Sequence, residues 1–404
     1  MSYLELQANV LKWIGIFPPV DSSSSPTLFR AYTVYRVLFI SVVSVVAFAT
    51  TLQLLVAPDL TMIARTIDLW TMFVSGIFKW YCMARSSDDF MEFNTNLMAI
   101  QNQGLILYGR RAQRFTADYM GPVRQTTVIY LLCGLCAVLL YTINPLLNYP
   151  QNGRSDLVYF NDPNSYPLCA WMPFTVKERW VFNGIFFLHV FTMAGITNVY
   201  LGIDSFMFGA MYAVGGQIEL LNASLDNIEK TLVSDGDDQN STMKFEKDQQ
   251  NQFHSMIVQS IKHHILILKY IRKLRVMFSL LILVDYLHGL ISLTFAMFQT
   301  TISVDVSEKI AVIFFIALSL GHQFLNNFFG EYIIQKQMSV RTSLYNVPWW
   351  RADKQVRGCL TLMITRSNEQ TIIDGFYMYK LCFKSFIAFV KALYTYYMVL
   401  RQLQ

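Results

Sequence analysis

Seven apolar runs, each long enough to cross a lipid bilayer as a helix, constrain this sequence more than any other feature. A helix of about 20 residues is about 30 Å long, which matches the hydrocarbon core of a bilayer. The chain is 54% hydrophobic and 15% charged, whereas soluble proteins contain about 25% charged residues. We therefore expect an all-α integral membrane protein with seven transmembrane helices. The expected spans are Thr33–Ala57, Met62–Ala84, Thr126–Leu147, Trp180–Val214, Val276–Ile302 and Lys309–Phe329, with a seventh that begins near Tyr377.

An amphipathic segment precedes the first span. Tyr3–Phe17 carries apolar residues at helical spacing among polar ones, and Pro18 follows directly. The apolar residues are Leu4, Leu11, Trp13, Ile14 and Phe17. A helix with one apolar face can lie on a membrane surface with that face in the headgroup region. We expect an interfacial helix here.

The last apolar run, Phe383–Leu403, carries a stripe at helical spacing. Lys391, Thr395, Val399 and Gln402 follow one another at intervals of three or four residues, which places them on one face. A spanning helix with a polar face needs water or protein on that side. Copies from several subunits around a symmetry axis could enclose water, and burial against the chain's own bundle explains the pattern equally well.

Basic residues are concentrated in every second connection between the spans. They precede the first span and follow the second, fourth and sixth, and examples are Lys12, Arg124, Lys273 and Lys336. Lys and Arg are enriched on the cytosolic side of membrane proteins. The bias predicts a cytosolic N-terminus and an extracellular C-terminus.

Several function classes fit the sequence poorly. A G-protein-coupled receptor would have the opposite orientation, so no G protein is expected, and a transporter would favour two related halves, which we do not find. An enzyme needs convergent polar residues, but His189, His288 and His322 are scattered over three spans without metal spacing. We expect no catalytic residues, cofactor or metal. The net charge of +5 is dispersed, so no nucleic-acid partner is expected.

Several short motifs resemble the insect odorant receptor family. They occur in a consistent order over the whole chain, and the resemblance is strongest in the C-terminal part. The motifs are Leu6–Pro19, Tyr166–Phe174, Ser343–Trp349, Leu362–Ser367, Asp374–Phe376 and Tyr394–Gln402.

The resemblance implies a ligand-gated, nonselective cation channel at the plasma membrane, in the dendrite of a sensory neuron. Four subunits would surround one pore. Val399 matches the family's hydrophobic gate and Gln402 its narrow mouth, with Lys391 and Thr395 also lining the pore. Arg401 departs from the apolar residue expected at its position.

The family contains a shared co-receptor and many tuning subunits. The segment between spans four and five, residues 215–275, is much shorter here than in the co-receptor, so the chain resembles a tuning subunit. Its expected partners are the co-receptor in a heterotetramer, a small volatile odorant, permeant cations and the bilayer. A gustatory-type homotetramer remains an alternative, and a transporter is a more distant one.

Three parts are expected along the chain. Residues 1–330 would form a six-helix ligand-binding domain with the N-terminal interfacial helix, residues 331–374 cytosolic anchor helices, and residues 375–404 the pore-lining seventh helix. In the anchor, Tyr345, Trp349 and Trp350 are aromatic residues of the kind that stabilise subunit interfaces. Packing within one chain would explain these residues nearly as well.

The resemblance also places a ligand pocket in the outer half of the bundle. There an aromatic cage would hold a small volatile by dispersion and stacking, and the aromatic lining favours an aromatic ligand. Ordinary core packing explains each candidate equally well. The candidates are Trp70, Phe73, Val74, Ile77, Cys136, Ala137, Leu140, Tyr141, Phe182, Phe186, His189, Met193 and Phe315, with Phe314 and Leu318 nearby and Trp171 and Phe174 as a cap.

Overall fold

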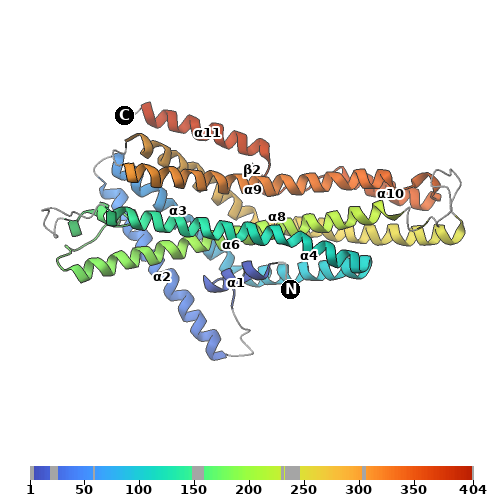
Figure 1. The fold of residues 1–404 in the computed structure, drawn as a ribbon, viewed down its shortest axis with the longest axis horizontal. Helices are drawn as coiled ribbons and strands as arrows, with labels where there is room; N and C mark the ends of the chain where they lie inside the picture. The colour runs from blue at the N-terminus through green and yellow to red at the C-terminus, as the bar shows by residue number, and fades with distance from the viewer. Residues whose placement is uncertain are drawn as a thin grey trace.

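The computed structural model describes residues 4–18, 26–57, 60–147, 159–228, 232, 246–302 and 306–402. Long helices lie side by side along the longest axis of the molecule (Figure 1). Tyr3 and Leu403, the expected limits of the first and last helices, lie outside the described residues. The main helices are α1 (Glu5–Trp13), α2 (Pro26–Val56), α3 (Leu60–Arg85), α4 (Ser87–Leu147), α6 (Arg179–Asp226), α8 (Lys247–Ile302), α9 (Val306–Asn346), α10 (Lys354–Ser367) and α11 (Phe383–Gln402), with short 3₁₀ turns at Pro163–Ser165 (η1) and Trp349–Arg351 (η2).

Four of these helices extend well beyond the apolar runs. α4, α6, α8 and α9 continue into polar sequence, and these extensions gather with α10 at one end of the molecule (Figure 1). Buried contacts join the extensions: the Tyr270 hydroxyl donates to the Phe93 carbonyl at 2.9 Å, and their rings stack 4.2 Å apart. The polar segment after the second span is therefore part of one 61-residue helix, α4.

α6 is the central helix of the bundle. Every residue from Val199 to Met211 is buried, and α6 contacts α1, α2, α3, α4, α8 and α9. A helix that is covered on all sides must be apolar on all sides. Asp204 is the acidic residue in this buried stretch, so it needs a partner from a neighbouring helix.

The N-terminal helix α1 packs differently from the expected interfacial helix. Leu4, Leu11, Ile14 and Phe17 are buried in the protein core, because α1 lies against α6. Gly209 of α6 permits this approach, since a Cβ there would lie 2.5 Å from Leu4 Cδ2. Most of the apolar face that we expected to meet lipid is thus covered by protein, and of its residues only Trp13 is largely exposed, at 82%.

The last span begins at Phe383 rather than near Tyr377. The intervening residues form a hairpin in which β1 (Asp374–Gly375) pairs with β2 (Tyr379–Lys380). Phe376 and Tyr377 at its tip have positive φ angles of 49° and 62°, which a helix cannot contain. The chain therefore reverses direction before α11 starts.

Five of the described helices are long and apolar enough to cross a membrane by length and composition: α2, α6, α8, much of α9 and residues 121–143 of α4. α3 and α11 are the right length, but they carry charged residues among the apolar ones, such as Lys79 on α3 and Lys391 on α11. Charges within the bilayer require partners or water. Lys79 and Lys391 therefore each need an ion-pair partner or water.

Candidate functional site

A cavity of about 470 Å³ lies among α3, α4, α6, α8 and α9. Its walls are mainly apolar, as small-molecule sites usually are. The lining residues are Leu69, Met72, Thr126, Ile129, Tyr130, Cys133, Gly134, Ala137, Val138, Tyr141, Met193, Thr197, Tyr200, Leu201, His288, Phe315, Ala317, Leu318, Ser319, Gly321, His322, Phe324 and Leu325.

Some residues that the sequence assigns to a pocket line this cavity. Ala137 and Tyr141 come from α4, Met193 from α6, and Phe315 and Leu318 from α9. Helices that are far apart in the sequence thus bring these residues together. On α3 the expected residues are neighbours of the lining ones, because Leu69 and Met72 face the cavity.

The other expected pocket residues lie elsewhere. Phe73 is fully buried in the core, and the Trp70 indole donates to Thr51 Oγ1 at 2.8 Å. Phe182 and Phe186 pack with Tyr166 in a separate aromatic cluster next to the loop before α6, and the His189 ring lies 5.5 Å from that of Tyr166. Val74, Ile77, Cys136, Leu140 and Phe314 do not line the cavity, nor do Trp171 and Phe174 of the loop.

A buried charge cluster lies next to the cavity. Lys79 Nζ is 2.6 Å from Asp204 Oδ1 and 2.8 Å from Asp285 Oδ1, and all three side chains are almost fully buried. The cluster ties α3, α6 and α8 together. In addition, His322 Nε2 of α9 lies 3.0 Å from Asp204 Oδ2.

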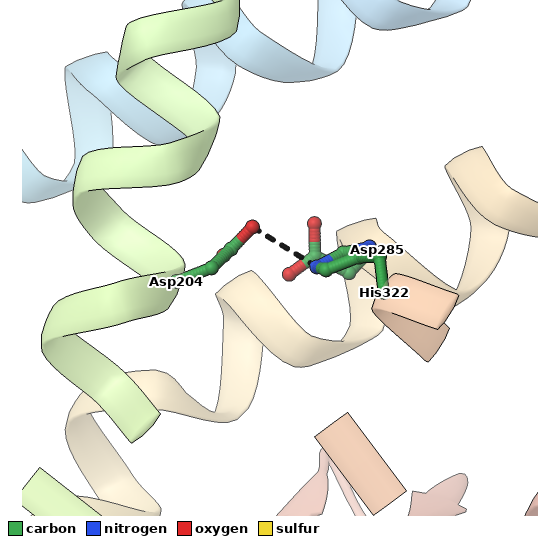
Figure 2. A group of neighbouring side chains, drawn as sticks. All are labelled: Asp204, Asp285 and His322. Carbon is green, nitrogen blue, oxygen red and sulfur yellow. Dashed lines mark ion pairs between the residues drawn. The ribbon is translucent and has the colours of Figure 1, made fainter. Parts of the chain in front are cut away.

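The acidic and histidine groups of this cluster could by spacing hold a metal ion. Figure 2 shows Asp285 and His322 directed toward Asp204, and their ligand atoms lie within 4.8 Å of one another. However, the ammonium of Lys79 already supplies the cation between the two carboxylates. We therefore interpret the cluster as an ion-pair network that fixes the helices.

The charge cluster and the cavity share side chains. Lys79 Nζ lies 4.4 Å from the centre of the Tyr200 ring, and the Tyr130 ring stacks on His322 at 6.1 Å. Tyr130, Tyr200 and His322 also line the cavity. One polar end of an otherwise apolar cavity is thus built directly on the cluster.

Sequence reasoning missed this convergence, although a signal for it existed. Lys79, Asp204 and Asp285 are isolated charges of opposite sign in three apolar runs. Such charges usually pair inside a membrane protein. Which of them pair depends on helix packing, which periodicity alone does not reveal.

The face of α11 that carries the expected pore residues points away from the bundle. Phe389 and Leu393 are buried against α8 and α9, whereas Lys391, Thr395 and Gln402 are exposed and Val399 is 52% exposed. α11 lies at the edge of the bundle in Figure 1. Its stripe is therefore not covered by the described part of its own chain.

Two residues of α9 connect the cavity region with the start of α11. Phe324, which lines the cavity, stacks on Phe383 at 6.1 Å and meets Phe386 edge-on at 5.6 Å. Asn327 of α9 donates to the Tyr379 hydroxyl and accepts from the Cys382 backbone N–H. A shift of α9 would therefore change the contacts that hold the start of α11.

The expected anchor residues lie at the end of the molecule that contains the helical extensions. Tyr345, Trp349 and Trp350 are all exposed, and the two tryptophan rings meet edge-on at 6.0 Å. Large exposed aromatic side chains leave this surface available to another chain.

The chain resembles known proteins in sequence and in structure. The sequence profile described as "7tm Odorant receptor" matches residues 60–394. Odorant receptor 85b of Drosophila melanogaster is 21% identical over 312 residues, which are 74% of this chain and 72% of that protein. Odorant receptor 22c of the same species is 19% identical over 318 residues, 78% of this chain and 73% of that protein.

Among solved structures, the insect olfactory receptor OR5 from Machilis hrabei in complex with eugenol has a TM-score of 0.80 at 12% identity. The match covers 100% of this chain and 98% of the receptor. A second structure of that receptor gives 0.74 at 11% identity, with the same coverage of both chains. At such low identity the likeness establishes the fold, seven transmembrane helices.

We expect Lys79→Met to destabilise the protein by ~3–5 kcal/mol, because it leaves two buried carboxylates without a cation. Cell-surface biotinylation and thermal unfolding in detergent would measure the effect. Lys384→Met on α11 is a matched control, since Lys384 is exposed. Wild-type surface levels and an unchanged Tm for Lys79→Met would contradict a structural role for the cluster.

Proposed function

The chain belongs to the insect odorant receptor family, whose members are ligand-gated channels, and we propose that it is an odorant-tuning subunit of a nonselective cation channel. It is not an enzyme. One observation carries the proposal: Phe324 lines the apolar cavity and also packs against Phe383 of α11, the candidate pore helix. The proposed partner is the insect olfactory co-receptor, in a heterotetramer in the plasma membrane of a sensory dendrite.

The cavity supports binding of a small volatile. Its volume of about 470 Å³ lies within the range of about 300–1,000 Å³ typical of small-molecule sites, and its walls offer dispersion and aromatic contacts. The OR5 receptor of similar fold was solved with eugenol, a small aromatic molecule. We propose that Ala137, Tyr141, Met193 and Phe315 contact the odorant.

The remaining candidates of the sequence-based pocket would act indirectly. Phe182, Phe186 and His189 pack near the loop between α4 and α6, where they would support the outer end of the bundle. Phe73 and Trp70 would hold α3 against its neighbours. These roles are proposals from packing.

The position of α11 supports a pore role. Its outward stripe of Lys391, Thr395, Val399 and Gln402 would face copies from other subunits around a shared axis. A ring of valine side chains dewets a narrow pore, and glutamine amides offer oxygen to passing cations. We propose Val399 as the gate and Gln402 as the mouth.

The charge distribution supports a cytosolic N-terminus. Lys273, Lys336 and Arg366 belong to the helical extensions and α10, and such residues favour the cytosolic side. Tyr345, Trp349 and Trp350 are exposed in the same region, and we propose that they anchor neighbouring subunits there. α11 would then end on the extracellular side.

The proposed gating step is a population shift. A ligand that fits the cavity better when α9 has moved favours that packing by its difference in binding free energy. Phe324 and Asn327 would carry the movement to Phe383 and Cys382 at the start of α11. The gate at Val399 would then widen.

Whole-cell current from cells that express this chain with an insect olfactory co-receptor tests the function. We expect volatiles to evoke nonselective cation current, and cells with either subunit alone to lack the same response. Current from this chain alone would instead indicate a self-sufficient homotetramer of the gustatory type. No volatile-evoked current in co-expressing cells, with the protein at the surface, would refute the proposal.

We expect Val399→Ala to raise the resting current, because smaller side chains let water wet the gate. Whole-cell current without odorant measures this effect.

Phe324→Ala should lower the maximal odorant-evoked current at unchanged surface level, because it removes contacts between the cavity wall and α11. Whole-cell current with and without odorant measures this effect.

The double variant Phe324→Ala/Val399→Ala shows whether the pore still conducts when the contacts of Phe324 are removed. Its resting leak should match that of Val399→Ala, since Phe324→Ala leaves the pore itself unaffected. An unchanged resting current in Val399→Ala would count against this gate. A full odorant response in Phe324→Ala would count against the coupling.

A further inference from the structure

Most strong polar groups on the cavity wall are already engaged by the protein. The Tyr141 hydroxyl donates to Asp68 Oδ2 at 3.2 Å, and the Tyr200 hydroxyl shares a hydrogen bond with Ser75 Oγ. His322 Nε2 lies 3.0 Å from Asp204 Oδ2. These groups hold helices together, so they have little capacity left for a ligand.

His288 of α8 is different. Its ring lines the cavity, and its Nδ1 is buried without a hydrogen-bond partner among the described residues. The ring packs against that of Tyr200 with centroids 5.4 Å apart, which holds it in place. A buried polar atom without a partner is costly, and native proteins leave few of them. The cavity wall therefore has one buried polar atom, His288 Nδ1, that a hydrogen-bonding ligand could pair with.

The cavity also limits the charge of a ligand. Its walls are mainly apolar, and the nearby cation Lys79 is already paired with Asp204 and Asp285. A charged ligand would lose its hydration without gaining a free counter-ion. A neutral molecule with one polar group fits best.

We infer that the preferred ligand is a small neutral alcohol or phenol whose hydroxyl hydrogen-bonds the His288 imidazole. A neutral imidazole has one donor and one acceptor nitrogen, and a hydroxyl can match either of them. The rest of the molecule occupies the apolar part of the cavity beside Ala137 and Phe315. This inference rests on the proposed odorant-binding function and assigns its ligand class.

The test compares aromatic alcohols and phenols with the hydrocarbons that lack only the hydroxyl, for example 2-phenylethanol with ethylbenzene. Half-maximal concentrations are measured from current in cells that also express the co-receptor. For active pairs, the hydroxyl compound should be about tenfold more potent than the hydrocarbon on the wild-type protein. This ratio corresponds to about 1.4 kcal/mol, the size of a good hydrogen bond.

His288→Phe keeps an aromatic ring but removes both nitrogens. It should lower the potency of the hydroxyl compound about tenfold and leave that of the hydrocarbon nearly unchanged. His288→Asn, which restores a donor and an acceptor, should recover part of the preference. Leu287→Phe, at the exposed neighbouring position, controls for the effect of a phenylalanine on this part of α8.

Two results would overturn the inference while leaving the proposed function intact. One is an equal loss of potency for both members of each pair in His288→Phe. The other is activation by volatiles without any preference for the hydroxyl group. An absence of current for every volatile tested would refute the proposed function and this inference together.

Discussion

The ion pairs of Lys79 with Asp204 and Asp285 are the interaction on which the rest of the bundle depends. Charges inside an apolar bundle are tolerated only when they are paired, and pairing here requires α3, α6 and α8 to keep one relative position. That position leaves room for the cavity beside Tyr200, which contacts both Lys79 and the cavity. The ion pairs thereby help to determine the shape of the cavity, although Lys79, Asp204 and Asp285 do not line it.

α9 links the cavity with α11. Its residues Phe315 and His322 line the cavity, while Phe324 and Asn327 contact the start of α11. A single continuous helix therefore touches both the proposed ligand site and the proposed pore helix. Side-chain packing would be the physical route for the proposed coupling, because packed interfaces pass on small shifts rather than absorbing them.

The helices were predictable from the sequence, and the faces they present were not. Apolar runs predicted the seven helices, since the bilayer requires such runs, although the seventh begins at Phe383 rather than near Tyr377. Trp70, Val74 and Ile77 were expected in the pocket because they are apolar and lie in the outer half. Leu69 and Met72 line the cavity instead, because packing against the neighbouring helices sets the rotation of α3 about its own axis. The hairpin at Asp374–Lys380 was missed for a related reason, since its two-residue strands have no periodic pattern.

Filling the cavity tests the central claim, that its occupant controls the current. Ala137→Phe places a ring in the cavity, whereas Leu139→Phe adds the same ring to an exposed position of the same helix. Odorant-evoked current, normalised to surface protein, should be lost in Ala137→Phe and kept in Leu139→Phe. An unchanged concentration–response curve in Ala137→Phe would contradict the account and place the ligand elsewhere.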